Sequence, residues 1–196
     1  MLTEIILATS NVNKLKELNR IGSGKIRFIS MKEAGIEDEI EETGRTLEEN
    51  ALLKARYVFE RLRKPVLSDD SGLLVDALNG APGVYSARFA GPQKNDEDNL
   101  QKLLHDLSGK ENRNACFKTV LAFIDSGTET LFQGEVQGKI TESKSGIHGF
   151  GYDPIFIPAG CTKTFAQMTA DEKNEISHRN RALQKFFAYL NLPAKP

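Results

Sequence analysis

Residues 5–20, IILATSNVNKLKELNR, decide the fold class that the sequence predicts. Residues 5–8 are a continuous apolar run bounded by polar residues, as in a buried β-strand. The polar residues Thr9, Ser10 and Asn11 follow, and a helical pattern runs from Val12 to about Arg20. A strand, a polar turn and a helix in this order are the beginning of an α/β unit.

The rest of the chain predicts further strands and helices of a mixed sheet. In the first half of the chain we expect a strand over 26–29, a helix over 46–62 that Pro65 ends, a short buried strand over 66–68, and glycine-rich loops over 72–92. A helix over 96–107 with Asn95 as N-cap follows, and then an antiparallel meander over 114–140 with a turn at 126–127. A glycine-punctuated loop over 146–151 leads to a helix over 170–190, where Thr169 and Glu172 have the spacing of a capping box. The predicted fold class is therefore α/β, with helices on the faces of a mixed sheet and a β-rich second half. We expect residues 1–196 to form one structural unit with two lobes and a soft boundary near residue 111.

Composition narrows the class of protein but not its function. A chain of 196 residues suits one domain, and its 26 basic and 27 acidic side chains leave a net charge of −1. That balance counts against a nucleic-acid-binding protein, which needs a basic surplus to neutralise phosphates. The apolar runs are too short to cross a membrane, Glu4 interrupts any signal peptide, and the two cysteines lack metal-ligand spacing. We expect a soluble cytoplasmic protein with reduced thiols.

Two segments carry donors that suit phosphate groups. Hydroxyl, amide and lysine donors over residues 9–14 stand where a helix N-terminus attracts anions. Taken alone, the segment favours an ordinary N-cap with a solvated Lys14, because it lacks a glycine-rich phosphate-binding loop. Lys54 falls on the edge of the apolar face of the predicted helix over 46–62. Such a lysine either extends to solvent or meets an anion in a cleft.

Acidic residues follow the predicted strand over 66–68. Asp69 and Asp70, with Glu41 and Glu42 available, could supply oxygen ligands for Mg²⁺, and a carboxylate there could deprotonate a water molecule. The alternative is a turn in which the aspartates cap the backbone.

The C-terminal third contains groups that suit a nucleobase. Glycines flank Phe150, so that its ring could lie open against a planar partner, and Asp153 could accept from a base N–H. Arg179 could donate to a carbonyl group of a base. With the phosphate donors and the carboxylates, these residues indicate a nucleotide site with a divalent metal.

Seven motifs in this order resemble the inosine triphosphate pyrophosphatase family, whose members act on non-canonical purine nucleoside triphosphates. The motifs are ATSNVNK at 8–14, EETG at 41–44, ENAxxKA at 49–55, SDDSGL at 68–73, GAPGVYSAR at 80–88, GFGYDP at 149–154 and EKxxxSHR at 172–179. One departure is Ser10, which stands where many members of the family have glycine.

The resemblance implies a Mg²⁺-dependent enzyme that converts ITP, dITP or XTP to the monophosphate and pyrophosphate. It implies an elongated α/β fold with two lobes around a central cleft, and a homodimer. It assigns the triphosphate to Thr9, Ser10, Asn11, Val12, Asn13, Lys14 and Lys54. It assigns Mg²⁺ to Glu41 and Asp70, with Glu42 as a substitute for Glu41. It implies that Asp70 and Lys54 are catalytic, with Asp70 as the proton acceptor for the attacking water. It assigns a substrate contact to Ser71. It assigns the base pocket to Phe150, Gly151, Tyr152, Asp153, Lys173, His178 and Arg179.

Two other functions stay open at this stage. One is a nucleotide pyrophosphatase that prefers a pyrimidine or a modified base. The other is a nucleotide-binding sensor without turnover, although a sensor has no need of a water-activating carboxylate.

Overall fold

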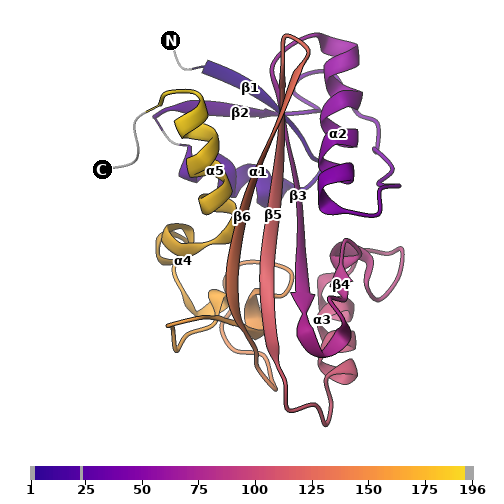
Figure 1. The fold of residues 1–196 in the computed structure, drawn as a ribbon, viewed down its shortest axis with the longest axis vertical. Helices are drawn as coiled ribbons and strands as arrows, with labels where there is room; N and C mark the ends of the chain where they lie inside the picture. Colours follow the sequence, from indigo (N-terminus) through magenta and orange to yellow (C-terminus); the bar gives the residue numbers. More distant parts are fainter. Residues whose placement is uncertain (1–2, 23, 193–196) are drawn as a thin grey trace. The chain divides into compact units, whose positions relative to one another are not determined.

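A single mixed sheet organises the fold in a computed structural model, which describes residues 3–22 and 24–192. Its strand order is β2-β1-β3-β5-β6-β7, and the short β4 pairs with β3 (Figure 1). The strands are β1 (Thr3–Ala8), β2 (Ile26–Ser30), β3 (Val66–Val75), β4 (Pro82–Gly83), β5 (Asn114–Asp125), β6 (Thr128–Ile140) and β7 (Phe156–Pro158). The α-helices are α1 (Val12–Ile21), α2 (Leu47–Leu62), α3 (Asp96–Asp106), α4 (Ala170–Ile176) and α5 (His178–Tyr189).

The sheet is mixed, as the sequence predicts. Strand β1 pairs in parallel with β2 and with β3, whereas β4 pairs antiparallel with β3 and β7 antiparallel with β6. Two residues, Ser126 and Gly127, join β5 to β6, which Figure 1 draws as a long hairpin. The predicted α/β class is therefore confirmed.

The chain forms two compact units that interleave along the sequence. The first unit takes its described residues from 1–70, 119–134 and 179–196, and the second consists of 71–118 and 135–178. Strands β3, β5 and β6 each contribute residues to both units. One division therefore falls between Asp70 and Ser71, and another between His178 and Arg179.

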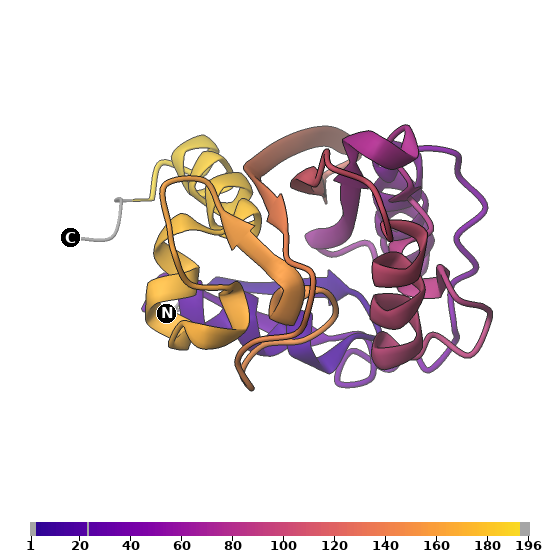
Figure 2. The same ribbon diagram turned by 90° about the horizontal axis from the view of Figure 1, so that it is seen from below.

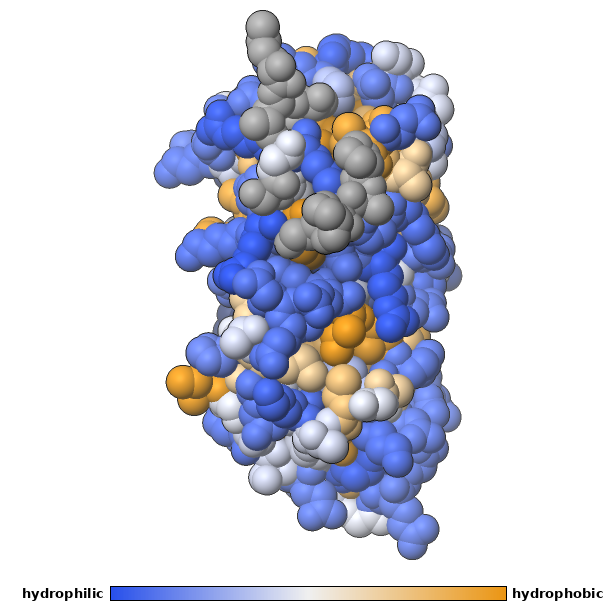
Figure 3. All heavy atoms as spheres, turned by 90° about the vertical axis from the view of Figure 1, so that its left-hand side faces the viewer, coloured by the Kyte–Doolittle hydropathy of each residue, from blue (hydrophilic) through white to orange (hydrophobic). Residues whose placement is uncertain are grey.

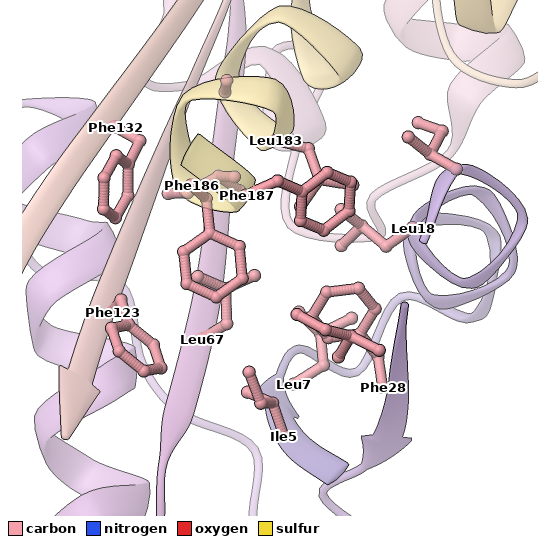
Figure 4. Close-up of a cluster of buried hydrophobic side chains, with 14 residues drawn as sticks. Ile5, Leu7, Leu18, Phe28, Leu67, Phe123, Phe132, Leu183, Phe186 and Phe187 are labelled. Atoms are coloured by element: carbon pink, nitrogen blue, oxygen red, sulfur yellow. The ribbon is translucent and has the colours of Figure 1, made fainter. Parts of the chain in front are cut away.

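The core of the first unit takes residues from β1, α1, β2, β3, β5, β6 and α5. Phe123 and Phe132 both pack against Phe186, with ring centroids 5.0 and 5.5 Å apart. Figure 4 shows how the side chains of this cluster converge from strands and helices. The buried members are Ile5, Leu7, Leu18, Ile21, Ile26, Phe28, Leu67, Leu121, Phe123, Phe132, Ala182, Leu183, Phe186 and Phe187.

The second unit has its own core, rich in aromatic side chains. Phe117 meets Phe156 edge to face at 4.6 Å between ring centroids, and Phe165 packs beside both rings. The buried members are Leu73, Val75, Leu100, Leu103, Leu107, Ala115, Phe117, Val136, Ile140, Tyr152, Ile155, Phe156, Phe165 and Met168. Each unit therefore has a buried apolar core of its own.

Strand β3 is longer than the sequence suggests. We expected a strand over 66–68 and loops from 72, but β3 continues to Val75, with Asp69 and Asp70 buried in its middle. Adjacent aspartates read as a turn because a strand interior rarely tolerates buried charge. Here the charges are neutralised by cations from other elements, so the strand continues through them.

The C-terminal helix is broken, whereas one helix was expected over 170–190. Helix α4 ends at Ile176, Ser177 is extended (φ −66°, ψ 152°), and α5 begins at His178. The N–H of buried Ser177 donates to the carbonyl of Lys173, which closes α4. The capping box of Thr169 and Glu172 is present as predicted.

The surface is mostly polar on the face shown in Figure 3, where apolar residues are scattered among hydrophilic ones. Among the described residues, no helix is both long and apolar enough to span a membrane. Cys116 and Cys161 are free thiols, each half-buried.

Candidate functional site

The segment from Thr9 to Lys14 forms a capped start of helix α1. The side-chain oxygen of Asn11 accepts from the backbone N–H groups of Asn13 (2.9 Å) and Lys14 (3.1 Å), and the Asn11 N–H donates to the Thr9 hydroxyl (3.2 Å). Ser10 and Val12 are exposed at this end of the helix. Asn11 thus occupies two of the N–H groups expected to hold phosphate, as in an ordinary N-cap. An anion at this helix end would have to displace the Asn11 side chain or use other donors.

Lys54 is a buried cation that contacts two acidic side chains. It belongs to the buried face of α2 with Leu47, Asn50, Ala51, Ala55 and Val58. Its ammonium donates to Asp70 Oδ1 (2.6 Å), Glu42 Oε1 (2.7 Å) and the carbonyl of Asp69 (2.9 Å). Of the two outcomes open to this lysine, the structure shows contact with anions. Burial without such partners would cost several kcal/mol.

Glu42 and Asp70 form a carboxylate pair that shares the Lys54 ammonium. Burial alone would raise the pKa of Glu42, but the charges of Lys54 and Lys14 lower that pKa to about 2. For Asp70, burial and the neighbouring Glu42 outweigh the same lysines and raise the pKa above its usual value. Two carboxylates in one site divide in this way because their negative charges repel. Glu41, to which the family resemblance assigns the metal, precedes Glu42 in the loop, and its side chain is exposed.

The loop that carries Glu42 is tied to the first turns of α2. Thr46 caps the helix by accepting from the Glu49 N–H (3.1 Å), and the buried Asn50 accepts from the Gly44 N–H (2.7 Å). A Cβ atom on Gly44 would lie 2.6 Å from Asn50 Oδ1 and 2.8 Å from Glu49 Cβ. Only glycine therefore allows the loop to approach the helix this closely.

We expect Gly44→Ala to displace the loop and to lower kcat/KM about tenfold, because Glu42 then loses its position beside Lys54. Overpacking of this kind also lowers the free energy of unfolding by about 1–3 kcal/mol. Steady-state kinetics and thermal melts measure the two effects. Gly35→Ala is the control, since a Cβ there meets nothing within 4 Å at a φ of +87°. Because alanine at Gly35 carries the strain of a left-handed backbone, the two variants are compared in kcat/KM. Equal losses of kcat/KM in both would show that the Gly44–Asn50 contact does not position Glu42.

Arg179 is buried among acids of the first unit. Its Nε donates to Asp69 Oδ2 (2.7 Å) and its Nη1 to Glu17 Oε2 (2.8 Å), and the residue is 1% exposed. We expected this guanidinium to face a purine edge. The structure shows it engaged by two carboxylates, one of which, Glu17, no sequence motif identified. Its role at the base stays a prediction.

A second group of predicted residues gathers in the second unit, on the segment that leads from β6 through β7 to α4 (Figure 2). The ammonium of Lys173 donates to Asp153 Oδ2 (2.7 Å), and the same oxygen accepts from the Phe150 N–H (2.9 Å). Lys173 also lies 4.9 Å from the centroid of the Phe150 ring, as in a cation–π contact. Asp153 therefore fixes the loop and the lysine together.

We expect Gly149→Ala to disrupt this arrangement, because the new Cβ would overlap the Asp153 carboxylate. Gly160→Ala is a matched control, since its φ of +80° is close to the +76° of Gly149 but nothing lies within 4 Å of its Cβ. The left-handed backbone costs both variants about 1–2 kcal/mol. We predict that only Gly149→Ala raises the KM for nucleotide, about tenfold or more, in steady-state kinetics. A KM that is equal in the two variants would contradict the role of this loop.

His178 and Tyr152 lie in the interior of the second unit. The His178 ring is stacked on Phe117 of β5, with centroids 4.7 Å apart and planes within 8°. The hydroxyl of Tyr152 donates to the carbonyl of Ser86 (2.9 Å), so it braces the loop from inside. Sequence reasoning missed Phe117 because a phenylalanine in an apolar strand reads as core.

Two other predicted residues lie elsewhere in the second unit. Ser71 is half-buried in β3, directly after Asp70. The N–H of Gly151 donates to Asp96 (2.8 Å).

The oxygen donors of the carboxylate pair are of the kind that a magnesium ion takes. Among the described residues, no group of three or more His, Cys, Asp or Glu side chains is placed to hold a metal. Mg²⁺ is commonly held by one or two carboxylates, with water and substrate phosphates completing the shell. Glu42 and Asp70 provide such a pair.

Comparisons with known proteins agree with the motifs. A model of the Ham1 family matches residues 5–189. The chain is 49% identical to a dITP/XTP pyrophosphatase of Bacillus subtilis, over 94% of this chain and 96% of that protein. It is 45% identical to a dITP/XTP pyrophosphatase of Christiangramia forsetii, over 96% of this chain and 99% of that protein.

A solved structure shows the same fold. The Ham1 protein of Staphylococcus aureus superposes with a TM-score of 0.87 at 42% identity, covering 96% of this chain and 98% of that one. The similarity therefore extends over both units.

Proposed function

Because the chain belongs to the Ham1 family, we propose that it hydrolyses non-canonical purine nucleoside triphosphates, with dITP, XTP and ITP as substrates, to the monophosphate and pyrophosphate. The observation that carries the proposal is the Lys54 ammonium held between Glu42 and Asp70. A buried lysine beside a carboxylate pair is suited to a polyanionic substrate that brings a cation with it. The names of the relatives specify the substrate class.

Asp70 is the group proposed to activate water. In the proposed step, a water oxygen attacks the α-phosphorus, the water proton passes to Asp70, and the bond from the α-phosphorus to the bridging oxygen breaks. Pyrophosphate leaves with the electron pair of that bond. A carboxylate whose pKa is raised is a stronger base than an ordinary one, which suits it to proton abstraction.

Lys54 and Lys14 are proposed to neutralise the triphosphate, on which negative charge shifts as the bond breaks. The side chain of Lys14 is 14% exposed and that of Lys54 7%, so neither charge is fully screened by water. Mg²⁺, held by Glu42 and Asp70, would supply further positive charge to the phosphate oxygens. The remaining residues of the segment 9–14, with Ser71, are proposed to position the phosphates.

The loop around Phe150 is proposed to hold the base. Lys173, Asp153 and the Phe150 ring form one packed group, which supports a role as a platform and a hydrogen-bonding edge. His178 stacks on Phe117 beside this core.

An isotope experiment tests the reaction. Hydrolysis of ITP in H₂¹⁸O should place one ¹⁸O atom in inosine monophosphate and none in pyrophosphate, as read by mass spectrometry. Label in pyrophosphate, or release of single phosphates, would overturn the proposed attack at the α-phosphorus.

We also propose a cytoplasmic homodimer. The free thiols of Cys116 and Cys161 suit a reducing compartment, where nucleotides are made and used. The dimer follows from the family resemblance. Light scattering after size-exclusion chromatography should give twice the 21.7 kDa chain mass, and a monomer at micromolar concentration would contradict it.

A further inference from the structure

Asp69 is a buried carboxylate for which the proposed reaction has no use. It is 0% exposed, although it stands next to Asp70 in β3. Successive side chains of a strand point to opposite faces, so the two aspartates serve different surroundings. Asp70 meets Lys54 and Glu42, whereas the Asp69 side chain meets Lys14 and Arg179.

Both oxygens of Asp69 are occupied by cations of the protein. Oδ1 lies 2.6 Å from the Lys14 ammonium and 3.5 Å from Arg179 Nη2, and Oδ2 accepts from Arg179 Nε at 2.7 Å. Charge-assisted bonds of this length in the interior are strong, and breaking them leaves buried charges uncompensated. Asp69 is thus poorly suited to act as a metal ligand or as a base.

The backbone of Asp69 adds to the same arrangement. Its carbonyl accepts from Lys14 (3.2 Å) and from Lys54 (2.9 Å), so the two lysines assigned to the triphosphate meet at one residue. Lys14 comes from the first turn of α1, Lys54 from α2 and Arg179 from the first turn of α5. Glu17, one turn after Lys14, holds the other side of the Arg179 guanidinium at 2.8 Å.

We propose that Asp69 is a positioning residue, which holds the Lys14 ammonium and the Arg179 guanidinium in place and touches neither the metal nor the attacking water. This inference rests on the proposed function, because Lys14 matters here as a triphosphate contact. Loss of the Asp69 charge frees Lys14 to turn toward solvent. The enzyme then binds the triphosphate less well while its metal site stays intact.

The first test separates positioning from metal binding. Asp69→Asn should raise the KM for ITP at least about tenfold and change the Mg²⁺ concentration for half-maximal rate by less than about twofold. At a matched ITP concentration it should also lower the thermal shift that ITP produces in EDTA, where no turnover occurs. A large rise in the Mg²⁺ requirement with an unchanged KM would make Asp69 a metal ligand and overturn the inference. Asp125→Asn, an exposed aspartate at the end of β5, is the control for the charge change.

A double-mutant cycle tests whether Asp69 acts through Lys14. In the Lys14→Met background, Asp69→Asn should add a smaller further rise in KM than it causes in the wild type, because one of the two cations that it positions is already gone. Fully additive effects would overturn the inference. If Asp69→Asn does not fold, the pair Asp69→Asn with Arg179→Gln, which removes the buried cation together with one of its two carboxylate partners, takes its place in both experiments.

The wild-type enzyme separates the two proposals. Absence of pyrophosphate release from ITP, dITP and XTP in the wild type would refute the proposed function. Activity in the wild type with an unchanged KM in Asp69→Asn would refute the role of Asp69 alone.

Discussion

Asp70→Asn is expected to lower the turnover of ITP by about 10²- to 10⁴-fold, the usual contribution of a positioned general base. Asparagine keeps an oxygen that can accept from Lys54, which now holds Asp70 at 2.6 Å. It cannot take a proton from water. The substitution therefore removes the proposed proton acceptor while changing the shape of the site very little.

Turnover is measured as pyrophosphate release at saturating ITP and Mg²⁺. Circular dichroism and a thermal melt check that the variant is folded. Asp125→Asn should retain full turnover. Full turnover in folded Asp70→Asn would refute the role of Asp70 as the proton acceptor.

Lys54→Met is expected to damage both stability and activity. Methionine replaces the apolar part of the side chain, but it leaves the Glu42 and Asp70 carboxylates without the ammonium that contacts both of them. Removing one partner of a buried ion pair costs about 3–5 kcal/mol. Loss of a preorganised charge at the phosphates lowers kcat by about 10²- to 10³-fold. Urea unfolding and steady-state kinetics measure the two effects.

The Lys54→Met variant also tests Mg²⁺ binding, in a measurement that does not depend on turnover. With Lys54 absent, Mg²⁺ becomes the available partner for the two carboxylates, so it should raise the melting temperature more in Lys54→Met than in the wild type. Lys64→Met, an exposed lysine after α2, should match the wild type in all three measurements. A smaller Mg²⁺ effect in Lys54→Met would argue against a metal at Glu42 and Asp70.

Most of the fold could be predicted because its elements carry local signals. Asn11, Thr46 and Asn95 all cap helices, and the periodic apolar residues of α2 appear as its buried face. The errors have non-local causes. Strand β3 continues through Asp69 and Asp70 because lysines and an arginine distant in sequence neutralise them. The break at Ser177 leaves no mark in the local pattern, since the residues on both sides are compatible with a helix.

The site could be predicted only in part. The position of Lys54 on the edge of an apolar face correctly signalled an unusual lysine. The choice between Glu41 and Glu42 could not be made from adjacent acids, and the structure places Glu42 against Lys54 through the Gly44–Asn50 contact. The engagement of Arg179 by Glu17, which is 162 residues away in the chain, could not be foreseen from spacing.

A steady-state panel of nucleoside triphosphates tests the central claim most directly. With Mg²⁺ present and absent, pyrophosphate release would be measured for ITP, dITP and XTP against ATP, GTP, dTTP and UTP. We predict kcat/KM values for the first three that exceed those for the others by at least about tenfold, and loss of the activity in EDTA. Faster turnover of dTTP or UTP than of ITP would contradict the assignment to non-canonical purines.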